Sequence, residues 1–154
     1  MIETKKDAIV FIIYAEPTAK GRPRFSRGRT YTPRRTKKYE ERVAEIARKE
    51  MGDKPPVKGA IKMTVSAYFQ VPSSWPNWKQ QAAQTGLLGH THRPDLDNLG
   101  KSISDALNGI VYEDDSQIVE MNIKKGYAYR NLIEVEIMPL RFHSANQVQR
   151  VDVA

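Results

Sequence analysis

The sequence predicts a mixed α/β (α+β) fold in which two main helices pack on one face of a small four-stranded sheet. Three observations indicate this class. Several segments have the continuous or alternating apolar pattern of strands, and two longer segments repeat apolar residues at helical spacing. The length of 154 residues suffices for one domain with its own core. We place that domain at residues 1–140 and expect residues 141–154 to form a polar, mobile C-terminal tail.

The composition excludes several classes of protein and favours an anionic partner. Lysine and arginine number 25 against 18 acidic residues, which gives a formal net charge of +7. This balance favours polyanions through release of their counterions. The absence of cysteine excludes a disulfide framework and a thiolate zinc site, and it fits a reducing cytoplasm. The apolar run at residues 8–14 is too short to span a membrane.

The N-terminal part combines a predicted strand with a strongly basic segment. Residues 8–14 are β-branched and aromatic, which predicts a buried strand. Residues 18–38 contain many basic residues, no acidic residue, and glycines and prolines that predict an irregular loop. The guanidinium groups of arginine bind phosphate, and aromatic rings stack on unpaired bases, so we expect this segment to contact nucleic acid. The alternative is that it forms a solvated, flexible arm. The candidate DNA-binding residues are Lys20, Arg22, Arg24, Phe25, Arg27, Arg29, Arg34 and Arg35.

The next elements are predicted from periodicity and from their stop signals. Helical spacing of apolar residues predicts a helix from a cap at Thr36 to a stop at Gly52. Alternation at residues 61–71 predicts a half-buried strand, after which residues 73–92 are expected to be irregular, with a short helix at about 78–84. We expect Trp75 and Trp78 to anchor this segment to the core; stacking on exposed bases is the alternative.

Two further alternating segments lie near the C-terminal end, at residues 119–124 and 133–137. A short connection between Gly126 and Asn131 separates them. This pattern predicts an antiparallel hairpin in which the two strands pair directly with each other.

Residues 93–115 concentrate carboxylates in an otherwise basic chain. Their apolar residues predict a helix from about residue 97 to 108, with Asp97 as the N-cap and Gly109 just past the end. Asp95 precedes this helix, while Asp114 and Asp115 follow it. If the next strand packs beside the helix, the carboxylate of either Asp114 or Asp115 can lie close to Asp95 and Asp97. Three residues would share one helix face at i, i+4 and i+8: Asp97, Lys101 and Asp105.

Carboxylates grouped in this way suit a hard divalent cation. Magnesium prefers carboxylate oxygens and keeps several waters, and it makes water a usable nucleophile for phosphodiester hydrolysis. Lys101 could stabilise the negative charge on an attacked phosphate. The nearby His90 and His92 could also ligate a metal, although solvated loop histidines are the simpler interpretation.

Simpler explanations of the acidic stretch stay open. Asp97 can serve only as a helix cap, and Asp114 with Asp115 can form only a turn. Lys101 can form an internal ion pair with Asp97 or Asp105. A calcium loop of the EF-hand type is excluded, because apolar residues occupy positions that need oxygen ligands. Those positions are held by Leu99 and Ala106.

Three segments of the chain resemble the RusA-type Holliday junction resolvases. They are KGRPRF at residues 20–25, RPDLDNLGKSISDALNG at 93–109 and YEDDSQIVEMNIKK at 112–125. The resemblance implies a small α/β homodimer that binds four-way DNA junctions and makes paired, symmetric nicks with magnesium or manganese. By motif position it implies that Asp95, Asp97 and Asp115 are the catalytic, metal-binding carboxylates. It also implies that Lys101 is a required lysine and Asp114 an adjoining metal-binding acid.

Two other functions agree with the same residues. A non-catalytic nucleic-acid-binding module would explain the charge and the aromatic residues, but not the spacing of the carboxylates. A nuclease of flaps or other branched DNA would explain both. The cleavage behaviour of synthetic four-way, flap and linear DNA separates these possibilities.

Overall fold

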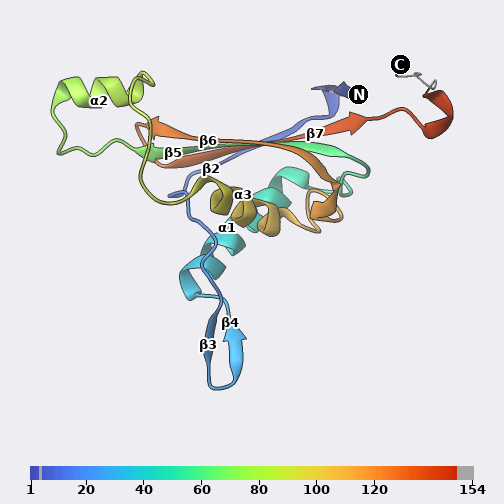
Figure 1. The fold of residues 1–154 in the computed structure, drawn as a ribbon, viewed down its shortest axis with the longest axis horizontal. Helices are drawn as coiled ribbons and strands as arrows, with labels where there is room; N and C mark the ends of the chain where they lie inside the picture. Colours follow the sequence, from blue (N-terminus) through green and yellow to red (C-terminus); the bar gives the residue numbers. More distant parts are fainter. Residues whose placement is uncertain (4, 149–154) are drawn as a thin grey trace, which may run out of the picture.

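The structure is a computed structural model that describes residues 1–3 and 5–148. A mixed sheet forms its centre, and helices α1 (Arg34–Met51) and α3 (Leu96–Leu107) cover one face of it (Figure 1). The predicted fold class is therefore confirmed. The strands of the sheet are β1 (Ile2–Glu3), β2 (Ile9–Ile13), β5 (Ile61–Gln70), β6 (Ile118–Ala128) and β7 (Leu132–Arg141).

Among the described residues the sheet has five strands instead of the predicted four, because the two-residue β1 adds to one edge. β2 and β1 pair antiparallel with successive parts of β7, so they share that edge. β7 pairs antiparallel with β5, and β5 pairs parallel with β6. The connection from β2 to β5 contains the basic segment and α1, and the connection from β5 to β6 contains α2 (Asn77–Gln84) and α3.

The predicted hairpin between the last two long strands is wrong. β5 lies between β6 and β7, and its residue Val65 pairs with Ile123 on one side and with Val135 on the other. The alternating patterns of β6 and β7 correctly indicate which side chains face the core. They do not identify the neighbouring strand. Strands that follow each other in sequence often pair, but another strand can lie between them, as β5 does here.

The core lies between the sheet and the two long helices. Buried residues of α1 include Val43 and Ala47, and those of α3 include Ile103 and Leu107. They pack against the apolar side chains of β2, β5 and β7 that face the helices. This packing places the N-terminal ends of α1 and α3 near the loop that follows β2.

The helices begin slightly earlier than predicted. α1 starts at Arg34 after Pro33, and Thr36 is a buried residue inside it whose hydroxyl accepts a hydrogen bond from the Gly21 amide at 3.1 Å. The prediction that Thr36 caps this helix is therefore wrong. α3 starts at Leu96, so Asp95 occupies the N-cap position that the sequence predicted for Asp97.

Part of the basic segment is more regular than predicted. Strands β3 (Arg24–Ser26) and β4 (Arg29–Tyr31) pair antiparallel and form a hairpin that projects from the body (Figure 1). We call residues 24–31 the arm hairpin. Arg27 and Gly28 form its turn with positive φ values of 49° and 76°. Such a turn matches the twist of a short hairpin, which explains how this polar segment forms strands.

The segment around α2 is only partly attached to the core as predicted. Trp75 packs edge-on against Tyr127 with ring centroids 5.4 Å apart, which anchors the segment to β6. Trp78 is 69% exposed and does not anchor it. Residues 149–154 of the predicted C-terminal tail lie outside the described residues. Among residues 1–3 and 5–148, no helix is both long and apolar enough to cross a membrane.

Candidate functional site

A polar cavity of about 900 Å³ lies where the arm meets the body. Three segments line it: the loop from Glu16 to Arg24, the first turn of α1, and the segment 93–98 that leads into α3. The cavity therefore brings the basic arm and the acidic motif together, although they are distant in sequence. Its charged lining residues are Glu16, Arg22, Arg24, Arg35, Arg93 and Asp95.

Asp95 and Asp97 lie at the N-terminal end of α3 with exposed carboxylates. Asp95 has the extended backbone of an N-cap, yet its side chain accepts no capping hydrogen bond. The partial positive charge at a helix N-terminus favours carboxylates there. Lys101 is exposed one turn beyond Asp97, on the same face of the helix. Both carboxylates are thus accessible to a ligand from solvent.

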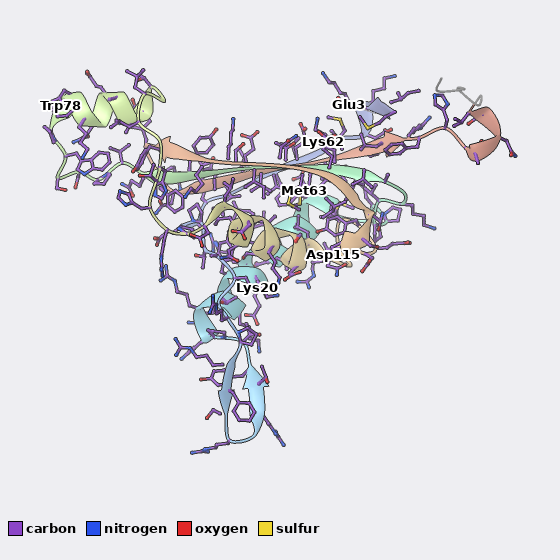
Figure 2. All side chains as sticks on the ribbon, in the orientation of Figure 1. Glu3, Lys20, Lys62, Met63, Trp78 and Asp115 are labelled. Atoms are coloured by element: carbon purple, nitrogen blue, oxygen red, sulfur yellow. The ribbon has the colours of Figure 1, made fainter. Side chains whose placement is uncertain are left out.

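Asp114 and Asp115 lie at the other end of α3. The helix has 12 residues, so about 18 Å of helix separates its two ends. Figure 2 shows Asp115 beyond the C-terminal end of the helix. Within the described part of the chain, no group of three His, Asp or Glu side chains is arranged to hold a metal. The sequence predicted that Asp114 or Asp115 can lie close to Asp95 and Asp97, and within the described part of one chain neither does.

Asp114 has a local structural role. It caps the short 3₁₀ turn Asp115–Gln117, where its carboxylate accepts a hydrogen bond from the Ser116 amide at 3.1 Å. The Gln117 side chain accepts in return from the Asp114 amide at 2.9 Å. The hydrogen bonds from Ser116 lower the pKa of Asp114. Asp115 is exposed at the start of this turn.

Lys20 is placed differently from the other predicted DNA-binding residues. Its ammonium forms an ion pair with Asp105 and lies 3.8 Å from a carboxylate oxygen of Glu40. Figure 2 shows Lys20 where the arm hairpin joins the rest of the molecule. The hydrogen bond with Asp105 raises the pKa of Lys20. Asp105 thus pairs with Lys20 and not with Lys101. This network joins the base of the arm to α1 and α3.

The remaining basic and aromatic residues lie on the arm or at its base. Phe25 is 75% exposed and Tyr31 is 47% exposed, so both rings face solvent. Arg35 forms an ion pair with Glu16 at 3.6 Å, and both side chains are largely exposed. Arg93 also lines the cavity and was not predicted as a site residue. Its position directly before the acidic motif would have indicated that it lies close to Asp95. The other predicted DNA-binding residues are exposed: Arg22, Arg24, Arg27, Arg29 and Arg34.

Gly100 allows α3 to lie very close to β6. A Cβ atom at this position would collide with Cδ1 of Ile123 and approach Sδ of Met121 to 3.1 Å. A larger residue would force the side chains of Ile123 and Met121 to shift, or the helix to move away from the strand. Glycine lowers helix propensity, so its presence here is explained by this close contact.

The two histidines near the acidic motif are placed differently from each other. His90 stacks on Phe69 with ring centroids 3.9 Å apart and tilts against Tyr127 at 5.1 Å. Burial lowers the pKa of His90, and the charges of Lys125 and His92 lower it further. The expectation of a solvated side chain is therefore wrong for His90 and agrees with the exposed His92.

Comparison with known proteins agrees with these observations. A family model described as endodeoxyribonuclease RusA matches residues 15–138. The chain is 37% identical over 137 residues to the uncharacterized protein YqaN of Bacillus subtilis, with coverage of 85% of this chain and 96% of that protein. It is 36% identical over 80 residues to the crossover junction endodeoxyribonuclease rusA of Lactococcus phage r1t, with coverage of 50% of this chain and 53% of the phage protein. The chain therefore belongs to the endodeoxyribonuclease RusA family.

Proposed function

We propose that this protein is a divalent-metal-dependent endonuclease that resolves four-way DNA junctions. The observation that carries the proposal is the arginine-lined cavity in which Asp95 lies at the base of a projecting, basic hairpin. Membership in the RusA family supports the nuclease activity. The name of the Lactococcus phage relative, a crossover junction endodeoxyribonuclease, supports the choice of substrate.

The arm hairpin would bind the DNA. Its exposed arginines suit the phosphates that crowd together where strands cross, because guanidinium groups bind phosphate oxygens in pairs. Phe25 and Tyr31 offer exposed rings on which unpaired bases at an opened crossover can stack. Lys20 would act indirectly, by holding the base of the arm on α3.

Asp95 and Asp97 would hold the cation. Their accessible carboxylates offer the hard oxygen ligands that magnesium prefers, and manganese would substitute for it. When bound, the cation would supply an activated water and neutralise charge on the attacked phosphate. The ammonium of Lys101, one turn away, would orient that phosphate and stabilise its developing negative charge.

A second copy of the chain would complete each catalytic centre. Asp115 lies beyond the C-terminal end of α3, whereas Asp95 and Asp97 lie at its N-terminal end. We therefore propose that Asp115 of the second copy approaches them in a homodimer. Charge complementarity supports this arrangement. The N-terminal end of α3 lies among arginines, whereas the turn after α3 carries the acidic residues Glu113, Asp114 and Asp115. Two symmetric centres would cut opposed strands and so produce paired nicks.

The test compares synthetic four-way, flap and linear duplex DNA with magnesium, manganese or a chelator. We expect paired nicks in the four-way junction with either metal and none with the chelator. Asp97→Asn should bind the junction with unchanged affinity but cut it at least about 100-fold more slowly. Robust nicking by that variant in magnesium would defeat the assignment of Asp97.

The same experiment decides between the alternative functions. Preferred cutting of flaps would identify a nuclease of other branched intermediates. Salt-sensitive junction binding without any metal-dependent nicking would identify a non-catalytic binding module, in which the acidic stretch has only a structural role.

A further inference from the structure

We infer that Lys125 is a positioning residue for the catalytic carboxylates, an inference that rests on the proposed nuclease function. Lys125 lies on β6, and its Nζ donates hydrogen bonds to the carbonyl oxygens of His92 at 2.9 Å and Pro94 at 3.1 Å. Pro94 directly precedes Asp95. One ammonium group therefore holds the backbone at two points just before the residue that enters the cavity.

The packing of α3 on β6 explains why Lys125 reaches this segment. Met121, Ile123 and Lys125 alternate along β6 and therefore share the face of the strand that α3 covers. Gly100 lets the helix approach Ile123 closely, which brings the N-terminal end of α3 over Lys125. The side chain of Lys125 then bridges from the strand to the segment that leads into the helix.

The hydrogen bonds of Lys125 favour positioning over direct contact with DNA. An ammonium group has three donors, and Lys125 uses two of them on backbone carbonyls. The charge of the donor strengthens both hydrogen bonds. Its charge also lies close enough to His90 to lower the pKa of that packed ring. Lys125 is thus half-buried on the inner side of β6, with its ammonium bound to the protein backbone.

Removal of this ammonium would free the segment before α3. The Asp95 carboxylate would no longer be held in one place relative to Asp97, although neither side chain changes. Loss of a group that orients a metal ligand typically lowers metal affinity or activity by about 10- to 100-fold. We expect a loss of this size in the rate of junction cutting and in the affinity for Mn²⁺, with junction affinity unchanged.

Lys124 provides a matched control for the experiment. It is the adjacent residue on β6, carries the same charge, is exposed, and faces the opposite side of the sheet. Lys124→Met therefore removes the same charge from the same strand, and keeps an unbranched apolar side chain, without touching the segment before α3. Lys125→Arg keeps the charge and the donors, so it should restore part of the activity. Lys125→Gln removes the charge, keeps an NH₂ donor group on a shorter side chain, and replaces Lys125→Met if that variant does not fold.

Three measurements on the full chain test the inference. Hydrogen exchange followed by mass spectrometry should show faster exchange of residues 91–98 in Lys125→Met than in Lys124→Met. Water-proton relaxation should show weaker Mn²⁺ binding by Lys125→Met than by wild type, and unchanged Mn²⁺ binding by Lys124→Met. Single-turnover cutting of a four-way junction should be slower in Lys125→Met, with partial recovery in Lys125→Arg.

Other outcomes would overturn the inference or its basis. Equal exchange, Mn²⁺ affinity and cutting in the two Met variants would refute a positioning role for Lys125. A loss of junction affinity with unchanged Mn²⁺ binding would show that Lys125 contacts DNA instead. A wild-type chain that neither binds Mn²⁺ nor cuts any junction would refute the proposed function, and the inference would fail with it.

Discussion

The ammonium of Lys20 is paired with the carboxylate of Asp105, a residue 85 positions further along the chain. Their side chains are only 29% and 26% exposed. The pair joins the base of the arm to α3, and the nearby Glu40 adds α1 to the same contact. This ion pair thus helps to fix the orientation of the arm hairpin relative to the cavity. One of its two members, Lys20, was predicted from the sequence to bind DNA.

Lys20→Met should lower the free energy of unfolding by about 1 to 2 kcal/mol, because it leaves the carboxylate of Asp105 without its partner. Urea unfolding measures the change. Lys38→Met, which removes an exposed lysine of α1, is the control and should have little effect. A double-mutant cycle with Asp105→Asn should reveal coupling between the two residues. Additive effects would show that the ion pair contributes nothing to stability.

Glu40→Gln should change the pH dependence of stability. Burial raises the pKa of Glu40 above its ordinary value of 4.5, with a smaller opposing effect from Lys20. The folded chain therefore binds the proton more tightly than the unfolded chain. The free energy of unfolding is highest below the unfolded pKa and falls as the pH rises through the raised, folded value. Glutamine cannot ionise, so the variant should lose this decrease.

Urea midpoints from about pH 4 to pH 7 measure this effect of Glu40. Relative to wild type, Glu40→Gln should be unchanged at the acidic end and more stable near neutrality. Glu41→Gln, on the exposed side of the same turn, is the control. A variant that is less stable than wild type at neutral pH would mean that attraction between Glu40 and Lys20 outweighs the cost of burial.

Arg22→Gln should weaken junction binding in a salt-dependent manner. Each lost phosphate contact should reduce the slope of log K against log salt by about 0.9. Arg22 lines the cavity, whereas the control Lys49 lies in the last turn of α1 and pairs with Glu45 at 4.0 Å. Lys49→Gln should leave the slope unchanged. Equal slopes for Arg22→Gln and wild type would remove Arg22 from the DNA interface.

Mixed dimers of Asp97→Asn and Asp115→Asn should regain nicking that neither variant has alone. If each centre combines Asp97 of one copy with Asp115 of the other, a mixed dimer has one intact and one doubly altered centre. Random mixing then restores about one quarter of the centres, because half of the dimers are mixed. Strand-specific labels should show single nicks without paired ones. A mixture that stays inactive would mean that each chain carries its own complete centre.

Gly100→Ala should destabilise the protein by about 1 to 3 kcal/mol, because the new methyl group would collide with Ile123 of β6. Alanine in a helix is otherwise more favourable than glycine by about 1 kcal/mol, so the sign of the change is informative. Gly89→Ala is the control, since beyond its two chain neighbours no heavy atom of residues 1–3 and 5–148 lies within 4 Å of an added Cβ there. Thermal unfolding measures both variants. A Gly100→Ala variant as stable as wild type, or more stable, would show that the side chain of Ile123 moves aside at little cost.

The predictable part of the fold follows from local patterns. The buried faces of α1, α3 and β5 agree with apolar spacing in the sequence, because helix and strand periods repeat over a few residues. The arm hairpin was not predicted, since its short strands are polar and its turn at Arg27 and Gly28 needs positive φ values. The insertion of β5 between β6 and β7 was not predictable from alternation, which indicates faces but not neighbours.

The sequence by itself determined the basic arm, the α3 face with Asp97 and Lys101, and the carboxylates at both ends of that helix, because residue type and spacing suffice for these features. Only the tertiary structure decided that Lys20 pairs with Asp105, that Lys125 holds the segment before Asp95, and that α3 separates Asp95 from Asp115. These contacts join residues that are far apart along the chain. They depend on how helices and strands pack, and no local pattern encodes that packing.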